Sequence, residues 1–265
     1  MELDTRGVED GTYTGTVTVS SANAGTVSVP VSITVDGQAP AITIQPIREW
    51  WFNPIGPVVT WTGQDNVTAG SNLLYSYILE PLDGSWSGYI QTTNRDLSGV
   101  ADGNYLLSVL ARDQALNETQ TPAGTVIRID RAGNLWKQRI VDADLDDEIT
   151  NVGQVSWNDD FDGDGASNLM EYYAGTDPTN PGDLFAFAQA NASQTGFVIH
   201  WKAKRGVTYQ VRRTTNLVTG PWEDAPTDAG ADQRSLVTAP ADGEQVYRDA
   251  TPITGPVFYK IDTME

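Results

Sequence analysis

Acidic side chains gather in one short segment at a spacing that suits a divalent cation. The segment 160–171 has aspartates at its first, third and fifth positions, glycine at its sixth and glutamate at its twelfth. This is the D-x-[DN]-x-[DN]-G-x₅-E pattern of a calcium-binding loop. Calcium is a hard cation that takes six to eight oxygen ligands. The predicted ligands are Asp160, Asp162, Asp164, the backbone carbonyl of Ala166, Asn168 and Glu171.

The surrounding sequence predicts a single loop of this kind. The segment 152–159 does not have the pattern of a regular entering helix, so a paired EF-hand is disfavoured. Between Asp142 and Asp183 the chain has twelve acidic residues and no lysine or arginine. Asp142 to Glu148 begins a similar spacing, but Asp147 stands where the glycine is required. A second calcium there is left open, and a solvated acidic run is the favoured interpretation.

Composition excludes several classes of function. The formal net charge is −19, which disfavours binding to nucleic acids and to anionic membrane surfaces, because both require basic faces. The absence of cysteine excludes disulfides and thiolate metal sites. No apolar stretch is long enough for membrane insertion. The N-terminus lacks a signal-peptide pattern, so, if the protein is secreted, we expect this chain to be a mature or excised piece of something longer.

Strand patterns surround the loop, with helical patterns next to it. Alternating apolar residues predict a hairpin with one buried face over 12–35, several antiparallel strands over 37–130 and more strands after 182. Helical spacing over 135–140 and 167–174 predicts two short helices, the second closed by Gly175. We therefore divide the chain into partial β-strands over 1–36, a sandwich over 37–130, an acidic helical calcium-binding linker over 131–182 and a C-terminal β-domain over 183–265.

The two N-terminal segments resemble bacterial extracellular modules. The stretch "DGTYTGTVTVSS…GTVSVPVSITV" resembles the closing strands of a BACON-type or related immunoglobulin-like module. The resemblance implies that its earlier strands come from a neighbouring chain or from a missing upstream domain. The stretch "GQDNVTAGSNLLYSYILEPLDGSWSGY…LSGVADGNYLLSVLARDQALNET" resembles bacterial immunoglobulin-like or fibronectin-III-like repeats.

The two C-terminal segments add a calcium motif and a final domain. The stretch "DFDGDGASNLMEYYAGTDPTNP" resembles the thrombospondin type 3-like calcium motif of secreted bacterial proteins, which implies that Asp177 also faces the metal. The next segment resembles the C-terminal β-domain that follows this motif. Together the resemblances imply a mainly β fold. Its tandem immunoglobulin-like or fibronectin-III-like sandwiches are joined by a short helical, EF-hand-like calcium-binding segment.

No catalytic site is predicted. His200 is the only histidine, and it falls opposite the apolar residues of its strand, where an exposed side chain is expected. No G-x-S-x-G sequence suggests a nucleophile. Trp50, Trp51 and Phe52 are expected between strands, where Trp50 and Trp51 would offer an aromatic platform to a sugar, with Trp86 as a similar candidate in a loop. The favoured alternative is that these residues close the end of the sandwich.

These observations predict a non-catalytic, secreted or cell-surface, structural or adhesive spacer whose inter-domain geometry is stabilised by Ca²⁺. Its partners would be cell-surface or extracellular polysaccharide or protein. One alternative is a carbohydrate-binding accessory region of a secreted polysaccharide-degrading enzyme. A second is a subunit of a surface fibre, assembled when the edges of the first hairpin pair with strands of a neighbouring chain.

Overall fold

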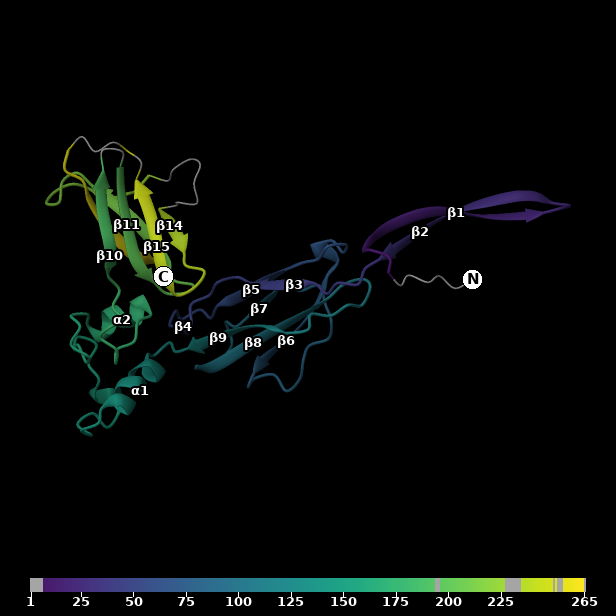
Figure 1. The fold of residues 1–265 in the computed structure, drawn as a ribbon. Coiled ribbons are helices and arrows are strands. Elements are labelled where there is room, and N and C mark those ends of the chain that lie inside the picture. Colours follow the sequence, from purple (N-terminus) through teal and green to yellow (C-terminus); the bar gives the residue numbers. More distant parts are fainter. Residues whose placement is uncertain (1–6, 194–195, 227–234, 250, 252–254, 265) are drawn as a thin grey trace. The chain divides into compact units, whose positions relative to one another are not determined.

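The computed structural model is mainly β, and it describes the whole chain except residues 1–6, 194–195, 227–234, 250, 252–254 and 265 (Figure 1). The chain divides into two compact units. Unit 1 comprises residues 1–44, 59–95 and 106–125, and unit 2 comprises 45–58, 96–105 and 126–265. The described residues contain no helix that is long and apolar enough to cross a membrane.

The first element of unit 1 is a long hairpin. Strands β1 (Gly11–Ser21) and β2 (Gly25–Val35) pair antiparallel, with Val17 opposite Val29 and Val19 opposite Val27. The alternating pattern predicted this hairpin correctly. The predicted burial of its apolar face is wrong, because Val19 and Val27 are each 62% exposed. The face remains exposed because none of the described residues forms a second layer over it.

Two further sheets contain the strands predicted between 37 and 130. One has the order β3-β5-β7 and the other β4-β9-β8-β6. Trp61 on β5 packs against Tyr75 on β6, with ring centroids 6.3 Å apart, so apolar faces of the two sheets meet. Trp61 is 1% exposed and lies in the core between these sheets. The strands are β3 (Ala41–Ile44), β4 (Trp50–Trp51), β5 (Val58–Gln64), β6 (Leu74–Glu80), β7 (Asn94–Asp96), β8 (Gly103–Arg112) and β9 (Ala123–Ile129), with a 3₁₀ turn at Gly70–Asn72.

Strand β4 corrects one sequence prediction. Trp50 and Trp51 do not lie between strands, because they pair in parallel with Arg128 and Ile129 of β9. The Arg128 N–H donates to the Glu49 carbonyl at 2.6 Å, beside this pairing. A two-residue strand is too short to show alternation, and a distant partner sets its conformation.

The linker in unit 2 contains the two expected helices. Helix α1 spans Asn134–Ala143 and α2 spans Asn168–Ala174, with a 3₁₀ turn at Val152–Gln154 between them. Trp136 and Ile140 of α1 are completely buried. They form a cluster with Val155 and Tyr172, and Trp50, Phe52 and Trp157 are among the residues that pack against it. The spacing of apolar residues predicted both helices, but it did not show which aromatic residues pack together between them.

The rest of unit 2 is a β-domain with two sheets. Its core includes Ile199, Trp201, Tyr209 and Tyr247, each 0% exposed. Ile199 and Trp201 flank His200 in the sequence, so the apolar residues predicted opposite His200 are buried. One sheet has the order β10-β11-β15; in the other, β12 pairs with β13, β14 and β16. The strands are β10 (Phe187–Ser193), β11 (Gly196–Ala203), β12 (Thr208–Thr214), β13 (Glu223–Asp224), β14 (Leu236–Thr238), β15 (Gly243–Asp249) and β16 (Phe258–Met264).

One close approach joins this β-domain to the segment before β4, within unit 2. Gly206 has φ +72°, and a Cβ atom there would lie 2.0 Å from the backbone carbon of Ile47. Only glycine combines this backbone conformation with such a short separation. The segment 47–52 therefore packs against both the C-terminal β-domain and the linker.

Candidate metal centre

The acidic loop is closed where its two ends meet. The Asn168 N–H donates to the Asp159 carbonyl at 2.7 Å, and the Asn168 side-chain amide donates to the Ser156 carbonyl at 2.7 Å. Helix α2 then begins with Ser167 as its N-cap and ends at Gly175, whose φ of +76° is left-handed. These contacts keep the loop and the first turn of α2 together, as the predicted site requires.

Hydrogen bonds inside the loop hold the aspartates in place. Asp160 accepts from the N–H groups of Gly163 at 2.8 Å and Gly165 at 2.9 Å. One oxygen of Asp162 accepts from the Asp164 N–H at 3.2 Å, and one oxygen of Asp164 accepts from the Ala166 N–H at 2.8 Å. Gly163 and Gly165 have φ of +77° and +98°, so glycine suits both positions.

Four buried side-chain oxygens of this loop have no hydrogen-bond partner. Asp162 Oδ2, Asp164 Oδ2, Asn168 Oδ1 and Glu171 Oε2 each expose less than 1 Å² and accept no hydrogen bond. Asn168 and Glu171 are each only 1% exposed. Oxygens from Asp160, Asp162 and Asp164 lie within 4.8 Å of one another. Four orphaned oxygens in one loop are costly unless a cation binds them.

The electrostatics of the loop lead to the same conclusion. Burial, together with the negative charges of Asp162 and Asp164, raises the pKa of the Glu171 carboxyl from 4.5 to about 8. Burial also raises the pKa of Asp162, with smaller contributions from Asp164 and Asp160 against a hydrogen bond that lowers it. A divalent cation among these groups would neutralise the repulsion and favour the charged carboxylates.

The residues fit calcium better than a softer metal. The orphaned donors are all oxygen atoms, and the loop has no histidine or cysteine. The ion would be held by Asp160, Asp162, Asp164 and Glu171, with Asn168 beside them. Ala166, whose carbonyl is a predicted ligand, is 8% exposed and lies between Asp164 and Asn168 in the loop.

Asp177, the weakest predicted ligand, has another partner. Its carboxylate forms an ion pair with Arg139 of α1 and accepts the Thr179 hydroxyl at 2.8 Å. The negative charge of Asp177 nevertheless contributes to the raised pKa of Asp162, although it is the smallest of the contributions. A direct role of Asp177 as a metal ligand stays a prediction.

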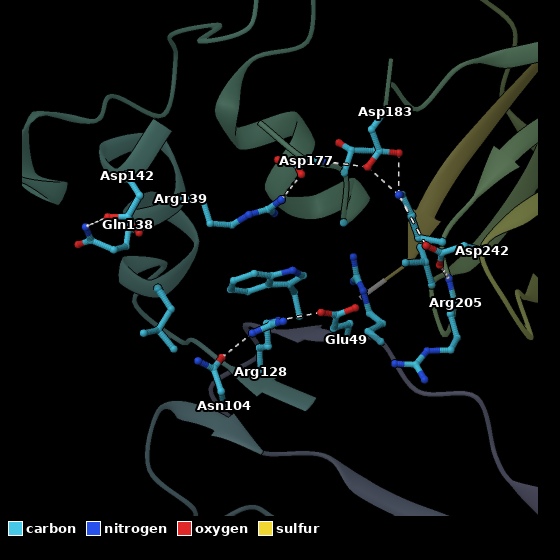
Figure 2. Close-up of a pocket in the computed structure, with 17 residues that line it drawn as sticks. Glu49, Asn104, Arg128, Gln138, Arg139, Asp142, Asp177, Asp183, Arg205 and Asp242 are labelled. Carbon is cyan, nitrogen blue, oxygen red and sulfur yellow. Dashed lines mark hydrogen bonds and ion pairs between the residues drawn. The ribbon is translucent and has the colours of Figure 1, made fainter. Parts of the chain in front are cut away.

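Asp177 also lines a polar pocket of about 510 Å³ within unit 2 (Figure 2). Charged pairs cross its walls: Arg128 to Glu49 at 2.7 Å and Lys204 to Asp183 at 2.6 Å. Arg128 also donates to Asn104 at 3.0 Å. The lining has as many acidic as basic side chains, so the pocket presents no net charge for an ionic ligand. The basic residues are Arg48, Arg128, Arg139, Lys204 and Arg205, and the acidic ones are Glu49, Asp142, Asp177, Asp183 and Asp242.

The structure also places the remaining candidates. His200 is partly buried, and its Nδ1 lies 2.7 Å from Glu244 Oε1. Trp86 is 39% exposed. Trp50 lies beneath the guanidinium groups of Arg128 and Arg139, at 5.3 and 5.6 Å from its ring centroid. Among the described residues, the run 142–148 does not bring three acidic side chains as close together as the loop does.

Sequence reasoning did not identify the aromatic contacts that tie α2 to the rest of unit 2. The Tyr172 hydroxyl donates to the Asp130 carbonyl at 2.6 Å, and its ring centroid lies 4.5 Å from that of Phe52. The Tyr173 ring packs edge-on against Phe52, with the ring centroids 5.2 Å apart. These partners lie about 40 and 120 residues earlier in the chain, so no local pattern could have revealed them.

Comparison with known proteins gives little further information. A scan against protein-family models finds no match, and a search of curated proteins finds none. Two solved structures from B. thetaiotaomicron share weak similarity: the extracellular domain of a hybrid two-component system (17% identity, TM-score 0.33) and that of a one-component system (11% identity, TM-score 0.29). The matches cover 42% and 43% of this chain and about a fifth of each structure (19% and 20%). At these TM-scores the likeness carries no argument about function.

Proposed function

We propose that this chain is a non-catalytic extracellular spacer region, structural or adhesive, in which one Ca²⁺ bound by the loop 160–171 holds the domains of unit 2 in a fixed geometry. The observation that carries the proposal is the set of four buried oxygens without hydrogen-bond partners in this loop. Their spacing and chemistry match a calcium loop at every required position.

The structure suggests how an ion here would act on the surrounding domains. Glu171 contributes an orphaned oxygen and lies next to Tyr172 on α2. Tyr172 in turn contacts Phe52 and Asp130, which belong to the segments flanking β4 and α1. A cation that fixes Glu171 would thereby fix the helix on which these contacts depend. Without the ion, the repulsion among the carboxylates would loosen the same contacts.

The extracellular assignment rests on sequence. The chain has no cysteine, is strongly acidic and contains the motif "DFDGDGASNLMEYYAGTDP", which resembles thrombospondin type 3-like calcium motifs of secreted bacterial proteins. Extracellular modules bind calcium with dissociation constants of about 10⁻⁴ to 10⁻³ M, which suits millimolar external calcium. We also propose that the β-sheets on either side of the linker are tandem immunoglobulin-like sandwiches.

Thermal unfolding and limited proteolysis, each with calcium and with EGTA, test the proposal. Calcium at a hundred times its dissociation constant adds about 2.7 kcal/mol, which raises the melting temperature of unit 2 by about 5–10 °C. The double variant Asp162→Ala/Glu171→Ala should lose this gain. Glu148→Gln, an exposed acid in the same acidic run, should retain it. An identical melting temperature and cleavage pattern with and without calcium would refute the proposal.

One observation favours carbohydrate binding as a second candidate function. A pocket of about 190 Å³ in unit 2 is lined by Trp50, Trp51, Phe52, Tyr172 and Tyr173, with Arg48 and Arg131 also in the lining. Aromatic walls with a few polar groups suit a sugar ring. Saturable quenching of tryptophan fluorescence by soluble polysaccharides, lost in Trp51→Ala and kept in Trp222→Ala, would support it. No change with any polysaccharide would exclude it.

A further inference from the structure

Unit 1 contains a second acidic cluster, formed by residues that are far apart in sequence. Asp36 follows the last residue of β2, Asp65 follows β5 and Asp113 follows β8. Carboxylate oxygens of the three residues lie within 4.8 Å of one another. Asp113 is only 2% exposed, and the other two are partly buried. The ends of three strands thus bring three carboxylates to one point.

Local hydrogen bonds orient two of these carboxylates through only one oxygen each. Asp65 Oδ2 accepts the N–H groups of Val67 at 3.0 Å and Thr68 at 3.3 Å. The Thr68 hydroxyl lies 3.5 Å from Asp36 Oδ2. The second oxygen of each carboxylate accepts no hydrogen bond.

Both carboxylate oxygens of Asp113 accept hydrogen bonds from Asn117, which also contacts Asp36. Asn117 donates its backbone N–H to Asp113 Oδ1 and its side-chain amide to Asp113 Oδ2, both at 2.8 Å. The same amide donates to the Asp36 backbone carbonyl at 3.0 Å. The cluster is thus a set of fixed positions and not a solvated acidic run.

The free oxygens are the independent sign that a ligand belongs here. Asp36 Oδ1 and Asp65 Oδ1 each expose less than 1 Å² and accept no hydrogen bond. No ion pair identified among the described residues reaches any of the three aspartates. The nearby carboxylate of Asp10 binds elsewhere, to the Gly37 N–H and the Asn66 amide. Two buried, unpaired carboxylate oxygens beside a third buried carboxylate favour a bound cation.

We propose that Asp36, Asp65 and Asp113 bind a second calcium ion, independent of the loop 160–171. The donors are all oxygen atoms, which excludes a preference for softer metals. Calcium accepts the irregular geometry of three separate strand ends more readily than Mg²⁺, which demands a near-ideal octahedron. The ion would join the base of the hairpin β1–β2 to the ends of β5 and β8.

Equilibrium dialysis of the full chain against ⁴⁵Ca²⁺, with the calcium concentration increased until binding saturates, tests this inference. We expect two ions per chain in the wild type, one in Glu171→Gln, one in Asp65→Asn and none in the double variant. Asparagine retains an oxygen that can accept from Val67 and Thr68, so the turn is preserved while the orphaned oxygen becomes an amide. Asp36→Asn provides a second variant with the same expectation. Glu80→Gln, an exposed acid of unit 1, is the matched control and should keep both ions.

The outcomes separate this inference from the proposed function. If Glu171→Gln binds no calcium, or if neither Asp65→Asn nor Asp36→Asn lowers the stoichiometry, the second site does not exist and the loop proposal is unaffected. If Glu171→Gln leaves the stoichiometry unchanged while Asp65→Asn reduces it, the second site is supported and the loop proposal fails. A wild type that binds no calcium overturns both.

Discussion

Replacing Glu171 with glutamine should change stability in opposite directions with and without calcium. In the calcium-free protein, burial and the neighbouring aspartates raise the pKa of Glu171 from 4.5 to about 8. A carboxyl whose folded pKa is raised contributes stability that is fully present below pH 4.5 and is lost as the pH rises through about 8. Glutamine keeps the shape of the side chain without the charge.

The size of the effect follows from these two values. At pH 7 the difference between a pKa of 4.5 and one of about 8 amounts to roughly 3 kcal/mol of lost stability. In EGTA, Glu171→Gln should therefore unfold at higher urea concentration, with a gain of about 1–3 kcal/mol. With calcium at a hundred times its dissociation constant, the wild type gains about 2.7 kcal/mol that the variant lacks.

Urea unfolding followed by tryptophan fluorescence measures both states, because Trp136 and Trp157 lie beside Tyr172 in the cluster that α2 covers. A pH series from 4.5 to 8 in EGTA should show a declining stability for the wild type and a flatter profile for the variant. Glu148→Gln should follow the wild type throughout. If Glu171→Gln destabilises the protein equally in EGTA and in calcium, then Glu171 is not a buried, repelled carboxylate, and the reasoning fails.

Three further predictions concern the parts of the chain that support the site. Gly206→Ala should cost more than about 2 kcal/mol in thermal unfolding, because its Cβ would meet the Ile47 backbone at 2.0 Å, whereas Gly84→Ala, with open space around it, should not. Asp249→Asn should destabilise the C-terminal domain by about 2 kcal/mol or more at pH 7. Burial raises the pKa of Asp249, but hydrogen bonds from Thr251, Tyr259 and Arg213 outweigh it, so the folded-state pKa is lowered below 3.8. The stability that the Asp249 carboxylate contributes is therefore present above pH 3.8 and is lost as the pH falls through the lowered pKa. The difference in stability between the wild type and Asp249→Asn should disappear over the same pH range. Val27→Lys should change the free energy of unfolding by less than about 0.5 kcal/mol, because Val27 is 62% exposed. Light scattering of the wild type and of Val27→Lys shows whether the hairpin assembles into fibres. Wild-type particles larger than a monomer that Val27→Lys abolishes would favour fibre assembly, and a monomer in both proteins would exclude it.

Local patterns were sufficient for the loop and its helix. The loop spans twelve consecutive residues, and Ser167 and Gly175 mark the helix ends within a few positions of it. The same holds for the apolar strand around Trp201. In each case the interacting groups lie close together in sequence, so periodicity and spacing contain the necessary information.

Long-range pairing accounts for what sequence reasoning missed. Trp50 and Trp51 became a strand only through β9, almost 80 residues later. The exposure of Val19 and Val27 could not be read from alternation, which shows that one face is apolar but not what covers it. Asp36, Asp65 and Asp113 meet only because three strands end together. The one available signal was an aspartate directly after each strand, and it is too common to be diagnostic.

Hydrogen exchange with and without calcium tests the central claim most directly, because it reports on the loop and on the segments that α2 contacts in one experiment. If calcium in the loop holds unit 2 together, saturating calcium should slow exchange at least tenfold in peptides covering 156–176, and also in those covering 45–53 and 130–143, relative to EGTA. Glu171→Gln should abolish the difference in all three regions. Equal exchange with and without calcium in the loop peptides would contradict the account, and protection limited to the loop would show that the ion does not fix the surrounding domains.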